Sequence, residues 1–377
     1  MRNLETELKS GVSRFSAYGK VSIGADTFPA EDSRSASGYV YKRAAFPVKI
    51  GSNNSIYVQM MGGHTADDPG VYVRNKDGEF FEIKWDLRDN EAVLDNVSDR
   101  SFITMRLEKD AEGKLVEKKF VSEYDAINYM AEHLHNDDQV YIGGNVEYRK
   151  YNGQIQRSFN ITTVALDDKN EPVAELLQTY LIDGSSVPRN WEKQLEENYE
   201  LTINAFVPQY VGKQEGRSIK KVLAFPQTMT LKATDDNLEK RKMIVKKFLM
   251  PEKGVVREIG MRNTMIDGYE ESTGNVELTP ELKELIELGF MTEEEVKKEA
   301  TISGRRIHQT VFGRPLLHRE NGVPKLSVAD RYTPEALVVE TDDEENVTTN
   351  DPFTSADESN DESNDNSLES EINAMFS

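Results

Sequence analysis

Alternating apolar and polar positions dominate the chain from Gly38 onward and predict a mainly β protein with a few helices. Turn-forming residues separate the alternating runs, as expected for strands joined in hairpins. The predicted strands cover residues 39–50, 55–61, 70–74, 80–86, 139–150, 154–167, 175–182, 199–211, 218–231, 242–250, 254–261 and 305–317. Helical spacing of apolar residues predicts helices over 1–15, 120–133 and 279–290, and a further helix that starts at Thr292.

The order of these elements predicts two OB-like β-barrels. Several strands, one helix and a closing hairpin follow one another between 36 and 170, which is the element order of an OB-fold. A second series of strands with a helical insertion, from 171 to 338, predicts another OB-like, decorated β domain. Residues 1–35 are then an N-terminal arm whose short helix docks through Leu4, Leu8, Val12 and Phe15.

The last segment, 339–377, differs sharply in composition. It carries twelve acidic residues and no Lys or Arg from Thr341 onward, so a net charge of −21 for the chain leaves −9 for the rest. So few apolar residues cannot offset the entropy of ordering, and the segment is predicted to be a disordered acidic tail. A solubility role would not require its apolar residues. These are predicted to bind partner proteins: Phe353, Ile372, Met375 and Phe376.

The turn Asn152-Gly153 predicts a tight hairpin and thereby the pairing of its strands. A two-residue type I′ turn places residues whose numbers sum to 305 opposite each other, so Val146 faces Phe159. The base of this hairpin is apolar, and its end is basic and aromatic. Aromatic rings stack on bases, and cations follow phosphates, so the end is predicted to bind nucleic acid. An ordinary solvated hairpin is the alternative. The predicted contacts are Tyr148, Arg149, Lys150, Tyr151 and Arg157.

Other basic patches add to this prediction. One lies on the strand at 39–50, and another, next to Tyr210, lies on the hairpin at 199–231. A dense basic run also spans 240–247. Each patch alone is typical of a solvated face, but several patches in an acidic body favour a nucleic-acid surface. The further predicted contacts are Tyr41, Lys42, Arg43, Lys213, Arg217, Lys220 and Lys221.

Catalytic and metal-binding signals are weak. The chain has no cysteine, which excludes disulfides, thiol nucleophiles and cysteine-based zinc sites. It has no phosphate-loop, nucleophile-elbow or zinc-protease motif. Two groups, His64 with Asp67 and Asp68, and His133 and His135 with Asp137 and Asp138, favour loop and helix-end roles over a metal site. We therefore predict no enzyme activity, cofactor or metal. The charged N-terminus and the lack of a long apolar run predict a cytoplasmic protein without a membrane partner.

Residues 140–151 and 156–161 resemble the later barrel strands of single-stranded DNA-binding proteins of the bacterial and phage type. The acidic tail with its apolar tip is similar to the C-terminus of that family. The resemblance implies an OB-fold, single-stranded DNA as ligand, and docking of replication, repair and recombination proteins on the tail. The chain departs from the family in its length, in lacking a Gly/Gln-rich linker, and in ending with Ser377 after Phe376. The large, cysteine-free chain with two predicted barrels resembles a phage replication protein, which implies a location in the host cytoplasm.

Together these signals predict a protein that coats single-stranded DNA with little sequence preference. RNA binding or strand annealing is one alternative, because stacking on a base is indifferent to the sugar. A non-nucleic-acid adaptor or virion component is a second, and a metal-dependent nuclease is a third. The sequence leaves the oligomeric state and the identity of the tail's partners open.

Overall fold

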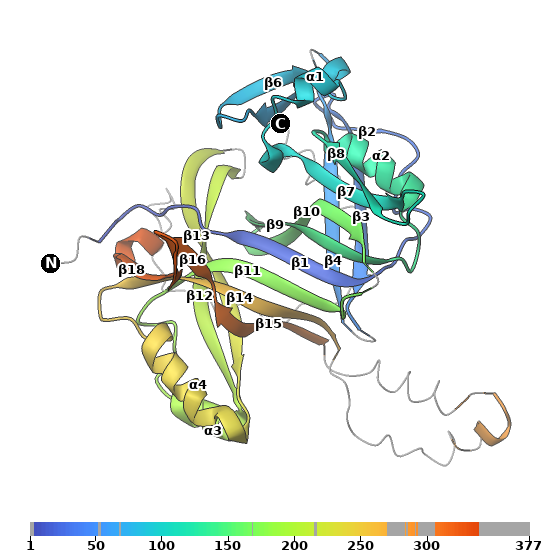
Figure 1. Cartoon of the computed structure of the whole chain (residues 1–377). Helices are drawn as coiled ribbons and strands as arrows, with labels where there is room; N and C mark the ends of the chain where they lie inside the picture. Colours follow the sequence, from blue (N-terminus) through green and yellow to red (C-terminus); the bar gives the residue numbers. More distant parts are fainter. Residues whose placement is uncertain are drawn as a thin grey trace.

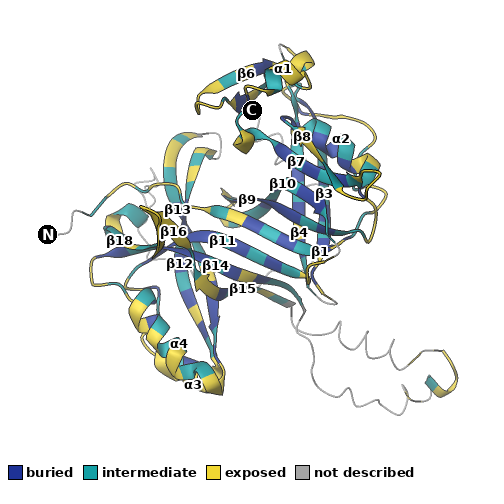
Figure 2. Cartoon of the chain, in the orientation of Figure 1, coloured by how far each residue is buried: buried dark blue, intermediate teal, exposed yellow. Residues whose placement is uncertain are grey.

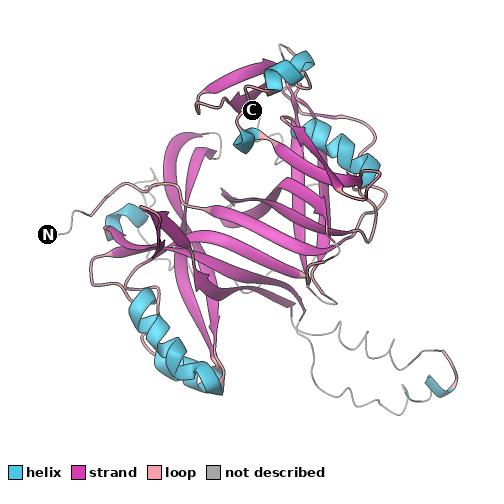
Figure 3. Cartoon of the chain, viewed as in Figure 1, coloured by secondary structure: helices cyan, strands magenta, loops and turns pink. Residues whose placement is uncertain are grey.

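The computed structural model describes residues 4–51, 54–67, 69–167, 169–214, 217–269, 283, 286–290, 292 and 306–338. It is mainly β, as predicted, and its principal sheet contains fourteen strands (Figure 3). The sheet is mixed and continuous, and as a whole it does not close into one barrel. The acidic tail and most of the helices predicted beyond residue 279 lie outside the described residues.

Five strands form the first strand group, in which the last strand of the pairing order pairs again with the first. β1 pairs with β3, β3 with β4, β4 with β10, β10 with β9, and β9 again with β1. The β4–β10 pairing is parallel and is limited to Gln59 and Asn160. The bounds are β1 Ser13–Val21, β3 Val40–Lys49, β4 Ser55–His64, β9 Gln139–Tyr151 and β10 Gln154–Leu166.

A second strand group repeats this order. β11 pairs with β12, β12 with β13, β13 with β15, β15 with β14, and β14 again with β11. The β13–β15 pairing is again parallel and limited to one residue pair, Thr230 and Val311. The bounds are β11 Val173–Ile182, β12 Glu200–Gln214, β13 Arg217–Lys232, β14 Val256–Tyr269 and β15 Arg306–Pro315.

The two groups share one sheet and one core. β1 and β11 pair antiparallel over six residues, and they lie side by side across the middle of Figure 1. Side chains from both groups, such as Phe15, Val146, Leu176 and Ile203, belong to the same buried cluster. Figure 2 shows buried and exposed positions alternating along these strands, which is the period-two pattern read from the sequence. The predicted division at residues 170 and 171 stays a prediction.

Helices occupy matching places in both groups. α2 (Glu123–His133) lies between β4 and β9 in the chain and buries Ala126, Ile127 and Met130 in the main core. α4 (Leu238–Ile244), continued by the π-helical turn η4 (Val245–Leu249), lies between β13 and β14 and buries Val245 and Leu249. A further helix described in the second strand group is α3 (Trp191–Asn198), which was not among the predicted helices.

Smaller elements decorate the first strand group and the chain's far end. The β5–β6 ribbon and its short helices form a small core of their own around Val73, Ile83 and Val97. Their bounds are β2 Ser33–Arg34, β5 Gly70–Arg74, β6 Phe80–Lys84, η1 Trp85–Leu87, α1 Glu91–Leu94, η2 Asp99–Ser101, β7 Ile103–Lys109 and β8 Leu115–Phe120. The later elements are η3 Asp235–Asn237, β16 Leu317–Glu320, β17 Val323–Leu326, β18 Val328–Tyr332 and η5 Pro334–Leu337.

The predicted hairpin over 242–261 is wrong in its first half, because residues 238–249 are helical. Apolar residues at 244, 245, 248 and 249 fit a helical stripe as well as a strand. Basic residues of the same helical segment pair with acidic residues of α3: Lys242 Nζ lies 2.7 Å from Glu196, and Lys246 Nζ lies 2.7 Å from Glu192. The run at 240–247 therefore contributes to helix–helix ion pairing.

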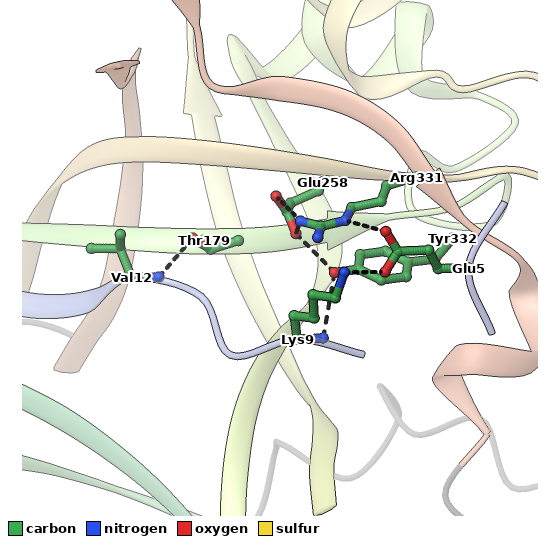
Figure 4. A network of polar contacts seen from close by, with 7 residues as sticks. All are labelled: Glu5, Lys9, Val12, Thr179, Glu258, Arg331 and Tyr332. Carbon is green, nitrogen blue, oxygen red and sulfur yellow. Dashed lines mark hydrogen bonds and ion pairs between the residues drawn. The ribbon is translucent and has the colours of Figure 1, made fainter. Parts of the chain in front are cut away.

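The helix predicted over residues 1–15 is also wrong. Residues 5–12 run along the second strand group, and Ser13–Val21 is strand β1. Figure 4 shows the contacts that hold this arm: the Lys9 amide donates to the Tyr332 hydroxyl at 3.4 Å, and the Val12 amide to Thr179 Oγ1 at 2.9 Å. Arg331 pairs with Glu5 at 3.3 Å and with Glu258 at 3.1 Å. Residues of neighbouring strands thus accept hydrogen bonds from amides that would otherwise bond within a helix.

Candidate nucleic-acid interface

The β9–β10 hairpin has the predicted turn and register. Asn152 and Gly153 have φ angles of 49° and 79°, the left-handed pair that a type I′ turn requires. Tyr151 therefore faces Gln154, and Val146 faces Phe159. Val146 and Phe159 are buried in the main core, so the predicted apolar base of the hairpin is confirmed.

Tyr148 lies on the inner face of this hairpin and is almost completely buried, with 1% of its surface exposed. Its amide donates to Gln209 Oε1 at 2.9 Å, and its carbonyl accepts from Gln209 Nε2 at 3.1 Å. Its hydroxyl lies 3.3 Å from Gln178 Oε1, and its ring lies 6.4 Å from that of Phe225. Burial raises the pKa of the Tyr148 phenol. The prediction that Tyr148 stacks on a base is corrected, because the second strand group covers its ring.

Arg157, opposite Tyr148, also faces inward. Its Nη1 donates to Thr310 Oγ1 at 3.3 Å, and its Nη2 lies 2.8 Å from His308 Nε2. Its guanidinium lies 5.1 Å from the centre of the Phe159 ring. Arg157 thus ties the end of the hairpin to β15, and both terminal nitrogens of its guanidinium have protein partners.

The outer face of the first strand group carries a row of hydrogen-bonded polar side chains. Arg43 Nη2 donates to Gln59 Oε1 at 2.9 Å, and Gln59 Nε2 donates to Asn160 Oδ1 at 3.1 Å. Asn160 Nδ2 donates to Glu147 Oε2 at 3.1 Å, and Arg149 Nη2 donates to Glu147 Oε1 at 3.1 Å. We call these five residues the polar ladder. It crosses β3, β4, β10 and β9 and has a cation at each end.

The polar ladder has an exposed aromatic neighbour. Tyr57 lies two residues before Gln59 on the same face of β4, and 58% of its surface is exposed. Lys150 is exposed and Tyr151 is partly exposed at the end of the hairpin. Guanidinium and amide donors bind phosphates, and exposed aromatic rings stack on bases. The polar ladder and Tyr57 provide both kinds of group. Gln59, Asn160 and Tyr57 were absent from the predicted contacts, although strand alternation places them on this face.

Two of the three residues predicted on β3 have structural roles. Tyr41 is buried and stacks on Tyr39, with ring centres 6.2 Å apart. Lys42 donates to Asn128 Oδ1 at 2.8 Å and lies 3.9 Å from Asp32, so it ties β3 to α2. Neither side chain presents its polar or aromatic group to solvent as predicted. The third, Arg43, belongs to the polar ladder.

The end of the β12–β13 hairpin carries the predicted cations of the second strand group. Lys213, Lys220 and Lys221 are exposed there, and the backbone of Arg217 pairs with Gln214. Tyr210, which neighbours these residues and is not one of the predicted contacts, has 55% of its surface exposed. This hairpin therefore presents an aromatic ring and several cations to solvent.

Within the described ranges, no three His, Asp or Glu side chains lie close enough together to hold a metal ion. His64 packs against Trp85 with ring centres 4.4 Å apart, and Asp68 lies outside the described residues. His135 lies 3.6 Å from Asp138, and His133 lies 3.9 Å from Glu108. Of the helices that the structure describes, none is both long and apolar enough to span a membrane.

Comparisons with known proteins give limited matches. A family model described as YorF matches residues 96–247, from just before β7 to η4, which is less than half of the chain. No curated protein matches. The solved structures to which the chain is similar include the wild-type single-stranded DNA binding protein from Thermus aquaticus, with a TM-score of 0.30 and 6% identity over 69% of this chain and 87% of that chain. A deletion mutant of that protein gives a TM-score of 0.28 and 8% identity, covering 69% and 89%.

Proposed function

We propose that this chain binds single-stranded DNA with little sequence preference and without catalysing a reaction. The observation that carries the proposal is the polar ladder, Arg43, Gln59, Asn160, Glu147 and Arg149, beside the exposed ring of Tyr57. An open row of donors with an exposed aromatic ring suits a flexible strand, because unpaired bases stack on rings while cations hold the backbone. The proposal rests on these residues and their placement in the sheet.

The strand order supports an OB-like interpretation of the first strand group. Its strands pair in the order first, second, third, fifth, fourth and again first, with α2 between the third and the fourth. In OB-folds, oligonucleotides bind across strands two and three and beside the loop between strands four and five. Here strands two and three are β3 and β4, and the last loop is the turn at Asn152. The polar ladder and Tyr57 lie on this surface.

The second strand group supports the same interpretation. Its order is again first, second, third, fifth, fourth and first, and α4 with η4 lies between the third and the fourth strands. Strands two and three are now β12 and β13, which carry Tyr210 and Lys213. Two OB-like units with a similar surface each would give one chain two binding sites for the same strand, and a linked second site raises the overall affinity.

The acidic tail has a place in this proposal. We propose that Phe353, Ile372, Met375 and Phe376 bind replication or recombination proteins in the cytoplasm, because apolar residues within an acidic segment suit docking into an apolar pocket. The same tail carries twelve negative charges and would compete with DNA for the cations of the interface at low salt. Deleting 341–377 is expected to raise the affinity for DNA at low salt, and unchanged affinity would contradict the competition.

Fluorescence anisotropy of a labelled oligo-dT, at several salt concentrations and with duplex of equal length as control, tests the proposal. We expect binding to the single strand that weakens steeply with salt. Tyr57→Ala is expected to weaken binding by about 1–3 kcal/mol, the value of one base–ring stack. Tyr72→Ala, at an exposed tyrosine of the β5–β6 ribbon away from the polar ladder, is the matched control and should leave affinity unchanged.

Two results would contradict the proposal. One is the absence of binding at low salt, with and without residues 341–377, which would favour an adaptor or virion role. The other is equal affinity for duplex and single strand. An oligo-rU of the same length separates DNA from RNA binding, and stronger binding to oligo-rU would favour the RNA-binding alternative.

A further inference from the structure

The polar ladder belongs to a longer row of residues that crosses both strand groups. Asn160 lies opposite Gln59 on β4 and opposite Asn145 on β9, and Asn145 lies opposite Arg14 on β1. The same register continues from Arg14 to Leu177 on β11, to Arg262 on β14 and to Arg314 on β15. Because directly opposed residues of neighbouring strands have their side chains on one face, these residues share a surface.

Three arginines stand where this row passes from the first strand group to the second. We call Arg14, Arg262 and Arg314 the arginine row. Adjacent strands lie about 4.8 Å apart, so the three residues span about 14 Å along the sheet. Figure 1 shows their strands, β1, β14 and β15, together with β11 between the first two, lying next to one another. None of these arginines was among the contacts predicted from the sequence.

The charges of the arginine row are only partly neutralised by the protein. Arg14 and Arg314 are exposed, and neither side chain has a hydrogen bond or an ion pair among the described residues. Arg262 donates from Nη1 to Glu175 Oε2 at 2.8 Å, while its Nε is buried without a hydrogen-bond partner. Buried donors are normally satisfied, so this Nε is an unmet donor beside two uncompensated cations. Among the described residues, Glu175 is the only acid that forms an ion pair with an arginine of the row.

An aromatic pair lies on the same face of the sheet. Tyr18 of β1 and Tyr141 of β9 are directly opposed, with ring centres 5.0 Å apart. The Tyr141 side chain leans over Gly143, because a Cβ added at Gly143 would lie 2.7 Å from its hydroxyl oxygen. Gly143 precedes Asn145 of the longer row on this face of β9. Both rings are partly exposed, so they could contact a base next to the backbone track.

We propose that the arginine row binds the phosphodiester backbone of the same single strand as it passes from the first strand group to the second. This inference rests on the proposed function. Arginine suits the role because its planar guanidinium can hold two phosphate oxygens at once. Contacts to phosphates position a strand without reading its sequence. The arginine row would then make one continuous track out of the two OB-like surfaces.

The test compares a full-length double variant, which carries both Arg14→Ala and Arg314→Ala, with the wild-type chain. Anisotropy with long and short oligo-dT is measured across a salt series. Each phosphate contact contributes roughly 0.7 to the slope of log affinity against log salt for a single strand, so the double variant should lose about 1.4. The long oligonucleotide, which reaches both strand groups, should lose more affinity than the short one.

Lys20→Ala combined with Lys84→Ala is the matched control. It removes two exposed cations, one at the end of β1 opposite to Arg14 and one on β6 in the separate β5–β6 ribbon. This control should leave the slope for the long oligonucleotide unchanged. Circular dichroism of both double variants checks that each is folded before its binding is interpreted.

The outcomes separate the inference from the proposed function. Wild-type binding with an unchanged slope in the arginine double variant would overturn the inference and leave the proposed function standing. No binding by wild type would overturn both. If deleting 341–377 abolished the difference between the variant and wild type, the row would bind the chain's own acidic tail, and the inference would again be overturned.

Discussion

Two hairpins with similar residues at their ends have different surroundings in this molecule. The β9–β10 hairpin ends with Tyr148 buried at 1% exposure and with Arg157 bonded to Thr310. The β12–β13 hairpin ends with Tyr210 at 55% exposure and with Lys213, which has no ion pair among the residues that the structure describes. Aromatic and cationic composition is therefore not enough to assign a ligand surface. What decides is whether another part of the fold covers the hairpin.

Residues of β12 and β13 cover the inner face of the β9–β10 hairpin. Gln209 of β12 both accepts from and donates to the backbone of Tyr148, as a neighbouring strand would. Phe225 of β13 then lies beside the Tyr148 ring. The inner face of the β9–β10 hairpin is consequently part of the contact between the two strand groups, and only its outer face, with Glu147 and Arg149, is left for a ligand.

The largest expected effect is on stability. Tyr148→Ala should lower the free energy of unfolding by about 3–5 kcal/mol, because removing a buried aromatic ring loses its burial and leaves a cavity. Tyr148→Phe retains the ring and loses the hydroxyl with its contacts to Gln178 and Arg157, and each such contact is worth about 1 kcal/mol. Urea denaturation followed by tryptophan fluorescence measures both variants.

The same pair of variants tests the assignment of Tyr148 to the core. Tyr148→Phe should bind oligo-dT as tightly as wild type, because no face of the ring reaches solvent. If Tyr148→Ala instead left stability unchanged and weakened binding, Tyr148 would belong to the interface, and the contrast between the hairpins would disappear.

The features that the sequence could predict are those set by neighbouring residues. Asn152-Gly153 determines the turn, the turn determines the register, and alternation then assigns Val146 and Phe159 to the core. The burial of Tyr148 depends on Gln209, which lies 61 residues further along the chain, and no local pattern indicates that contact. From local composition alone, a hairpin end rich in Tyr and Arg therefore predicts an exposed surface.

The polar ladder and the arginine row escaped prediction for the same reason. Gln59 and Asn160 are 101 residues apart and meet only because β4 and β10 pair. Arg14 was placed in a predicted helix, because Leu8, Val12 and Phe15 are also spaced as on a helical face. Once Ser13–Val21 is a strand, its even positions share one face, and Arg14 joins the row through its pairing with Asn145.

A smaller effect is expected at the exposed hairpin, and it falls on binding. Tyr210→Ala should weaken binding of oligo-dT by about 1–3 kcal/mol, or roughly 5- to 150-fold, because one base–ring stack is lost. Its stability should stay within about 0.5 kcal/mol of wild type, as is usual for exposed positions. Tyr210→Phe, which keeps the ring, is the matched control and should bind as wild type does. Equal binding by Tyr210→Ala and wild type would place the second strand group outside the DNA path.

The smallest expected effect distinguishes a cation that already has a partner from one that has none. Lys213→Ala should reduce the slope of log affinity against log salt by roughly 0.7, the contribution of one phosphate contact. Arg149→Ala should reduce it less, because Arg149 is already paired with Glu147 at 3.1 Å and would give up part of that interaction to hold a phosphate. Removing the acid instead, with Glu147→Gln, should strengthen binding slightly, since a negative charge leaves the track of the strand. A salt series with oligo-dT measures all three variants, and equal losses for Lys213→Ala and Arg149→Ala would show that the Glu147 pair does not restrain its arginine.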